Sequence, residues 1–266
     1  MKFRFEKKVL ALLEGSIDIH IHSAPDVYPR LLNDVELALS AKENGMRAIL
    51  VKNHYFETAG RARLASDVAD FPVFGGIALN LTNGGLNKVA VSMALKMGAK
   101  QVWMPTVHAD YFVRNKSHVA NLATEIPDDV QGLTLVNPDG SLKKELYDIF
   151  DLIKAADAIF STGHVTKEEA KIAVREAAKR GVKKILITHP AATFVHYTVE
   201  DMKEILRDHL NHPDSICRHP DGRDPELEQC QTVASIIMNL SRKEVHVASG
   251  PPCESEYQAL KFKALQ

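Results

Sequence analysis

The sequence has few cysteines and no pattern that pairs them. Its 266 residues include only Cys217, Cys230 and Cys253, with no CxxC spacing. An odd number of cysteines at wide spacing is typical of reduced thiols in a cytosolic protein rather than of a disulfide framework. Long apolar runs are also lacking, because Val9–Leu13 near the start is too short for a secretory core or a membrane span. We therefore expect a cytoplasmic protein without a membrane partner.

An excess of one charge sign is lacking as well. Lys and Arg number 33 against 34 Asp and Glu, the formal net charge is −1, and the basic residues form no block. A nucleic-acid partner is therefore not expected. Hydrophobic residues make up 45% of the chain, which is enough for a large core. We expect one domain over residues 1–266 that acts on a small molecule. Composition leaves open whether it is a monomer or a homo-oligomer.

Short β-branched runs alternate with longer amphipathic stretches along the chain. This alternation predicts βα units around a parallel sheet. Seven strands are predicted, at Ser16–His22, Ala48–His54, Val73–Asn80, Gln101–His108, Ala158–His164, Ile185–His189 and Val245–Ser249. The length is close to the roughly 250 residues of one eight-unit barrel. The sequence therefore predicts an α/β fold of the TIM-type (β/α) barrel class, distorted or seven-stranded, with a doubly wound open sheet as the alternative.

Local signals mark the ends of several predicted helices. Thr166 with Glu169 forms a capping pattern, and Thr198 followed by Asp201 opens another helix. Gly45, Gly98 and Gly181 are expected where helices stop.

Two segments do not fit the alternation. Residues 109–140, directly after the fourth predicted strand, form the longest irregular stretch, and we interpret them as a lid or substrate loop. Residues 211–226 are polar and contain three prolines, where another strand would be expected. Either a very short strand lies at Ser215–Arg218, or the barrel is distorted.

The strongest motif is Asp18-Ile19-His20-Ile21-His22 in the first strand. Side chains alternate along a strand, so His20 and His22 share one face and the isoleucines share the other. The isoleucine face is expected to meet the helices, and the histidine face to line the mouth of the barrel. Two imidazoles at this spacing can lean onto one zinc ion.

Four further predicted strands also end in histidine, at His54, His108, His164 and His189. The carboxyl ends of parallel strands meet on one side of an α/β barrel, so these side chains should converge. Neutral imidazole is the commonest metal ligand. A hydrogen-bonded structural cluster is the alternative. The remaining histidines are interpreted as solvated or hydrogen-bonded, namely His118, His196, His209, His212, His219 and His246. Of these, His219 lies in a compact polar turn that could reach the barrel mouth.

At these residues the sequence resembles the metal-dependent hydrolases of the amidohydrolase superfamily. The resemblance covers roughly residues 16–190 and implies an α/β barrel. His20, His22, His164 and His189 match the four histidines of that pattern. The sequence departs from it at two places. The fourth strand offers Thr106 or His108 instead of a lysine or acid, and the last strand lacks the metal-binding aspartate that serves as the base.

The first two strands also resemble the polymerase-and-histidinol-phosphatase phosphoesterases. That family has HxH and then a strand ending Thr-Asp-His, in a distorted seven-unit barrel. Here the second strand ends Lys52-Asn53-His54, so that Asn53 replaces an acid. The third strand also lacks the glutamate that bridges metals in that family. The pattern adds His54 to the predicted metal ligands.

Further residues have candidate roles near the predicted mouth. Lys52 shares a face with His54 and is expected to pair with a carboxylate such as Asp18 or to contact an anionic substrate. Asp26, on the loop after the first strand, is a candidate base, with a solvated loop carboxylate as the alternative interpretation. Glu254, after the last strand, is the candidate replacement for the missing aspartate. Asp18 is expected to orient a histidine.

Three residues are candidates for substrate binding, namely Arg30, Asn80 and His108. Ordinary surface charge is the alternative interpretation for Arg30. Asn80 begins a glycine-containing turn before a helix expected to be capped near Asn87, and such a turn can bind an anion.

These features predict a hydrolase that uses a divalent metal, zinc before manganese or iron, on a C–N or C–O bond of a small polar substrate. Phosphoester hydrolysis, a lyase reaction and a catalytically silent metal- or metabolite-binding barrel are the alternatives.

Overall fold

The structure is a computed structural model. It describes residues 10–116, 127, 129–190, 192, 195, 197–209, 216–220, 222, 231–239, 242 and 244–261. No helix in these ranges has the length and apolar character needed to cross a lipid bilayer.

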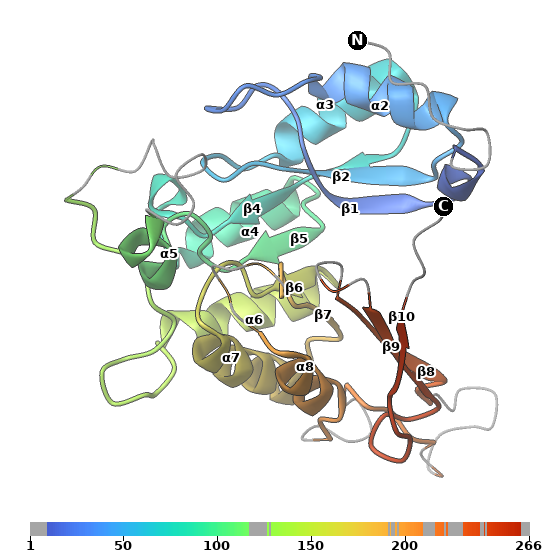
Figure 1. Ribbon diagram of the computed structural model, residues 1–266. Coiled ribbons are helices and arrows are strands. Elements are labelled where there is room, and N and C mark those ends of the chain that lie inside the picture. Colours follow the sequence, from blue (N-terminus) through green and yellow to red (C-terminus); the bar gives the residue numbers. More distant parts are fainter. Residues whose placement is uncertain are drawn as a thin grey trace.

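Strands and helices alternate through the first three quarters of the chain (Figure 1). The parallel strands are β1 (Ile17–His22), β2 (Ala48–Lys52), β3 (Val73–Phe74), β4 (Gly76–Ala78), β5 (Gln101–Trp103), β6 (Ile159–Ser161) and β7 (Lys184–Leu186). The α-helices are α2 (Asp34–Glu43), α3 (Ala59–Ala69), α4 (Lys88–Lys96), α5 (Asp110–Arg114), α6 (Glu145–Ala155), α7 (Lys167–Lys179) and α8 (Val199–Leu206). The described residues also form the 3-10 turns η1 (Ala11–Leu13) and η2 (Leu81–Asn83). The first six of the seven predicted strands are confirmed as parallel, and β3 with β4 makes up the third.

Pairing of the described strands gives two parallel sheets, β1-β2-β3 and β4-β5-β6-β7. Gly75 separates β3 from β4, and a Cβ atom there would overlap the backbone of Thr58 and Ala59. The expected α/β class with parallel strands is confirmed. Within the described ranges, however, the hydrogen-bonded strands form separate sheets rather than one closed barrel.

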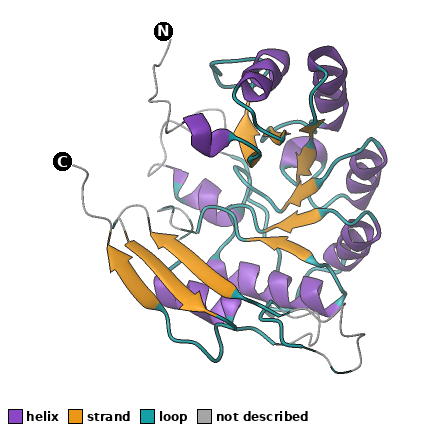
Figure 2. Ribbon diagram, turned by 90° about the vertical axis from the view of Figure 1, so that its right-hand side faces the viewer, coloured by secondary structure: helices purple, strands orange, loops and turns teal. Residues whose placement is uncertain are grey.

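The run of parallel strands is strongly curved. Neighbouring strands lie about 4.8 Å apart, so the outer strands of a flat run of six would be about 24 Å apart. The ring centres of His20 in β1 and His189 just after β7 are 4.6 Å apart, a distance that a flat sheet does not allow. Helices pack on the outer side of this curve (Figure 2).

The C-terminal part differs from the prediction. The predicted seventh strand is present as β9 (Glu244–Ser249), but it pairs antiparallel with β8 (Ala234–Asn239) and β10 (Gln258–Lys261) in a third sheet. The expectation of another parallel strand here was wrong. A strand's periodicity does not show the direction of its partner. No strand is present at Ile216–Arg218, and Ser215 lies outside the described residues.

Helix ends follow the local signals. Thr166 with Glu169 and Thr198 with Asp201 form complete capping boxes, and the Asn87 side chain caps α4. Gly45, Gly98 and Gly181 have positive φ just beyond α2, α4 and α7, as predicted.

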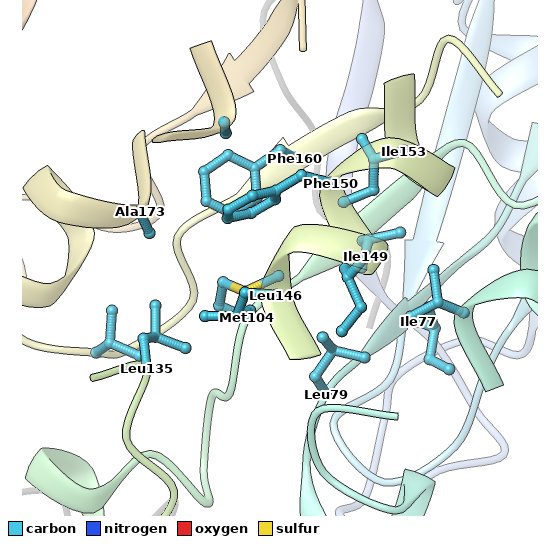
Figure 3. Packing of buried hydrophobic residues seen from close by; sticks show 14 of the residues in the cluster. Ile77, Leu79, Met104, Leu135, Leu146, Ile149, Phe150, Ile153, Phe160 and Ala173 are labelled. Carbon is cyan, nitrogen blue, oxygen red and sulfur yellow. The ribbon is translucent and has the colours of Figure 1, made fainter. Parts of the chain in front are cut away.

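The main core lies between α4, α6, α7 and the strands that they cover. Phe150 and Ile153 of α6 pack with Phe160 of β6 (Figure 3). A small inner group, Leu50, Ala78 and Trp103, fills the concave side of the curve. The isoleucine face of β1 differs from the expectation, because Ile17 and Ile19 are 49% and 37% exposed instead of covered by helices.

Residues 109–140, interpreted as a lid, begin with α5, whose Phe112 is fully buried. The amide of Asp110 donates to the Leu133 carbonyl and that of Leu133 to the His108 carbonyl. The stretch is therefore anchored at its base. Residues 117–126 and 128 lie outside the described part.

Candidate metal centres

Five histidines form a closed ring, which we call the histidine ring. Its members are His20, His22, His54, His164 and His189. Successive ring centres lie 5.5 Å (His20 to His22), 4.8 Å (to His54), 5.6 Å (to His164), 5.5 Å (to His189) and 4.6 Å (back to His20) apart. They come from the ends of β1, β2, β6 and β7. All five histidines predicted as metal ligands therefore lie together.

Each imidazole is brought to the ring by its strand end. His164 follows Gly163, whose positive φ and lack of Cβ let the turn pass against the carbonyls of Met104 and Pro105. His189 has φ 49°, a left-handed conformation that costs a non-glycine residue energy. The Thr106 hydroxyl lies 2.8 Å from Nδ1 of His54 and fixes that ring.

Burial keeps the imidazoles neutral. Burial, followed by the charge of Lys52, lowers the pKa of His20 to about 2, of His22 to about 3 and of His189 to about 4. The pKa values of His54 and His164 fall well below the usual value for the same two reasons. Neutral imidazole is the form that binds a metal. Rings that share a zinc ion have centres about 5 Å apart, given bonds of about 2.0–2.1 Å, and neighbouring centres in the ring match this. No three of the five described histidines have nitrogens that all lie within 4.8 Å of one another, so the ring is wider than a closed ligand set.

Lys52 lies inside the ring and is 1% exposed. Its Nζ is 3.2 Å from Nε2 of His20 and 5.2 Å from the Trp103 ring centre. Among the described residues no carboxylate lies within ion-pair distance of Nζ. Of the two expected roles, pairing with a carboxylate such as Asp18 is therefore not found, and contact with an anionic substrate stays a prediction. Burial, followed by the charge of Arg30, lowers the Lys52 pKa to about 7. Asp18 instead accepts the His20 amide, in keeping with an orienting role.

Asp26 and Arg30 lie together beside His22. Asp26 Oδ2 accepts from Arg30 Nε at 2.7 Å and is 4.0 Å from His22 Nδ1, while its buried Oδ1 has no hydrogen-bond partner in the described part of the chain. Arg30 also approaches His22 Nδ1 at 3.3 Å. Arg30 is therefore part of the ring's surroundings and not ordinary surface charge. Arg61 holds this loop through a two-point bond to Asp34.

Asn80 and His108, predicted to bind substrate, are engaged in the scaffold. The Asn80 amide donates to the His54 carbonyl and Thr106 hydroxyl, and its oxygen accepts the amides of Thr106 and His108. Asn80 thus connects the ends of three strands. His108 packs edge-on to Tyr55 at 6.2 Å and is buried outside the ring.

A second group, which we call the thiol cluster, was missed by the sequence interpretation. It consists of His209, Cys217, His219 and Cys253, whose nitrogen and sulfur atoms all lie within 4.8 Å of one another, so it can hold a metal ion. Among the described residues no other set of three or more His, Cys, Asp or Glu is drawn together as closely. The sequence signal available was Cys217-Arg218-His219, a Cys-x-His pair. Glu254, predicted to replace the missing aspartate of the barrel site, lies here, 3.3 Å from His219 Nδ1.

Comparison with known proteins identifies the family to which the chain belongs. The chain belongs to DUF6282, a family of unknown function. The match covers residues 15–211, which include the whole histidine ring and, from the thiol cluster, His209 alone. No curated protein matches the sequence.

Proposed function

We propose that the protein is a metal-dependent hydrolase that acts on a C–N or C–O bond of a small polar substrate at the histidine ring. The proposal rests on the convergence of five neutral imidazoles from four strand ends around a buried lysine. A hydrogen-bonded structural cluster is the alternative, and the contacts of His54 with Thr106 and of His20 with Lys52 are of that kind. A divalent cation, zinc before manganese or iron, accounts for the donor set.

The curved parallel strands support a TIM-type barrel in an incomplete form. In such barrels the site lies where the carboxyl ends of the strands meet, and the histidine ring has that position. The barrel would be completed on the β7 side by the antiparallel sheet instead of by further βα units.

His20, His22, His164 and His189 would hold the metal, with His54 adjacent. A bound divalent ion supplies a water whose pKa falls to about 7 and polarises the bond to be broken. Asp26 is the candidate base, with Oδ2 4.0 Å from His22 Nδ1 and a buried Oδ1 that has no hydrogen-bond partner among the described residues. Lys52, whose pKa is about 7, can exchange a proton near neutrality. The guanidinium of Arg30 can bind an anionic group of the substrate.

Phosphoester hydrolysis is the second candidate because of the position of His54. Its ring centre is 4.8 Å from that of His22, and Thr106 holds its Nδ1. Because Thr106 Oγ1 can accept a hydrogen bond from Nδ1, the Nε2 lone pair of His54 is free to bind a metal. The phosphoesterase resemblance requires a metal ligand at the end of the second strand, which is the position of His54.

Panels of amides, lactones and phosphomonoesters, each assayed with added zinc and manganese, test the proposal. We expect turnover of an amide or lactone that the double variant His20→Ala/His22→Ala loses together with its ring metal. His246→Ala, on β9 outside the ring, is the matched control. Equal metal content in the double variant and the parent protein would overturn the proposal. Normal metal loading without turnover of any substrate would favour a binding barrel.

A further inference from the structure

We infer that His209, Cys217, His219 and Cys253 form a structural zinc site, separate from the histidine ring. Four of the six pairs of donor atoms lie 3.1 to 3.7 Å apart, close to the spacing of ligands around one tetrahedral ion, and all six lie within 4.8 Å. Cys217 Sγ is 3.5 Å from Cys253 Sγ and 3.7 Å from His219 Nε2, and His219 Nε2 is 3.1 Å from both Cys253 Sγ and His209 Nε2. Around a zinc ion with bonds of about 2.3 Å to sulfur and 2.0–2.1 Å to nitrogen, ligand atoms are about 3.3–3.8 Å apart.

The donor types select the metal. Two thiolates with two imidazoles suit zinc, whereas calcium, magnesium and manganese favour oxygen ligands. Four protein ligands leave no open position for water, which is the arrangement of structural and not catalytic zinc sites.

Glu254 supports this assignment. Its Oε1 lies 3.3 Å from Nδ1 of His219, on the opposite side of the imidazole from Nε2. A carboxylate at Nδ1 keeps the proton there, so the Nε2 lone pair points at the other three donors. A disulfide between Cys217 and Cys253 would leave the convergence of two histidines and this carboxylate unexplained.

Backbone hydrogen bonds hold the ligands in place from both sides. Cys253 lies in the turn between β9 and β10, in which the amides of Glu254 and Ser255 donate to the Pro251 carbonyl. Arg207, at the end of α8, donates to the Pro252 carbonyl at 2.7 Å, and the Cys217 amide donates to Asp208. The ion would therefore fasten the antiparallel sheet to the segment that follows α8.

The test uses the full-length protein reconstituted with cobalt. Thiolate ligands give a cobalt charge-transfer band in the near ultraviolet, and no cysteine belongs to the histidine ring, so the band reports this site alone. We expect Cys217→Ser and Cys253→Ser to lose the band and about one zinc per chain. The double variant His20→Ala/His22→Ala should keep the band, which separates this inference from the proposed function.

The zinc affinity of the Glu254→Gln variant tests the site without removing any of its four proposed ligands. The substitution should weaken zinc binding by about 10–100-fold, while Glu256→Gln, at an almost fully exposed side chain two residues away, should leave it unchanged. Chelation of the parent protein should open residues 244–261 to protease. A cobalt form without the band, or a Cys217–Cys253 disulfide that persists through purification under reductant, would overturn the inference.

Discussion

The histidine ring and the thiol cluster combine similar donors in different ways. The ring contains only imidazoles, surrounds a buried lysine and is wider, with five members from four strand ends. The thiol cluster has two sulfurs, is partly exposed, and has its four donors within 4.8 Å of one another. A wide ring with spare donors leaves room for water and substrate, whereas a closed set of four does not. The comparison therefore separates a candidate for chemistry from a candidate for stability.

The largest effect should come from Lys52. Lys52→Met removes a proton-exchanging group from the ring and should lower turnover by roughly 100-fold or more. It should leave folding almost unchanged, because the long apolar stem is kept and no carboxylate loses its partner. Turnover rates and thermal melting measure the two effects. Early melting with unchanged turnover would instead make Lys52 a structural group. The cobalt–thiolate band should stay the same.

Metal affinity should rank the members of the ring. We expect His164→Ala and His189→Ala to abolish tight binding at the ring, and His54→Ala to weaken it by about 10–100-fold. Both β6 and β7 histidines match the amidohydrolase pattern, whereas Asn53 breaks the phosphoesterase one. Metal titration of the three variants measures this order. If the His54→Ala variant bound as little metal as the His189→Ala variant, the phosphoesterase proposal would be favoured.

A substitution of Thr106 tests whether metal binding at the histidine ring depends on the hydrogen bond that orients His54. Thr106→Val keeps the volume but removes the hydroxyl 2.8 Å from His54 Nδ1, so the imidazole loses its fixed orientation. We expect ring metal affinity to fall about tenfold, at the lower end for losses of this kind. Thr82→Val, at an exposed position in η2, is the matched control. The same titration decides the outcome, and equal affinities in the two variants would contradict it.

A different kind of effect, on stability instead of metal affinity, is a pH dependence of the metal-free protein. Below pH 6.5 the unfolded chain protonates the ring histidines, while the folded chain, with pKa values of about 2 to 4 at His20, His22 and His189, does not. The unfolded state then binds more protons, so the free energy of unfolding falls as the pH drops from 6.5 towards 4. The slope is up to about 1.4 kcal/mol per pH unit for each histidine. Denaturant unfolding at several pH values measures it, and His22→Gln should reduce the slope. A flat profile would show that the ring protonates freely while folded.

The positions of the ring histidines could be predicted because the signal is local. A histidine at the end of a predicted parallel strand lies on the same side of the sheet as the others, whatever the details of packing. The caps at Thr166 and Thr198 are equally local, since each depends on a residue three positions away. Alternation and strand direction therefore pointed to every ring member, but the same rule also included His108, which packing against Tyr55 holds outside the ring.

The environment of Lys52 and the thiol cluster were decided by the tertiary structure. Periodicity placed Lys52 on the inner face but did not show that no carboxylate would reach it, because partners come from other strands. Cys217 and Cys253 are 36 residues apart and meet only because β9 pairs with β8 and β10 and its turn folds back towards α8. The sequence by itself determined which side chains face the carboxyl ends of the parallel strands. Contacts between distant segments, which depend on how whole elements pack, decided that two sites exist and that Glu254 belongs to the second.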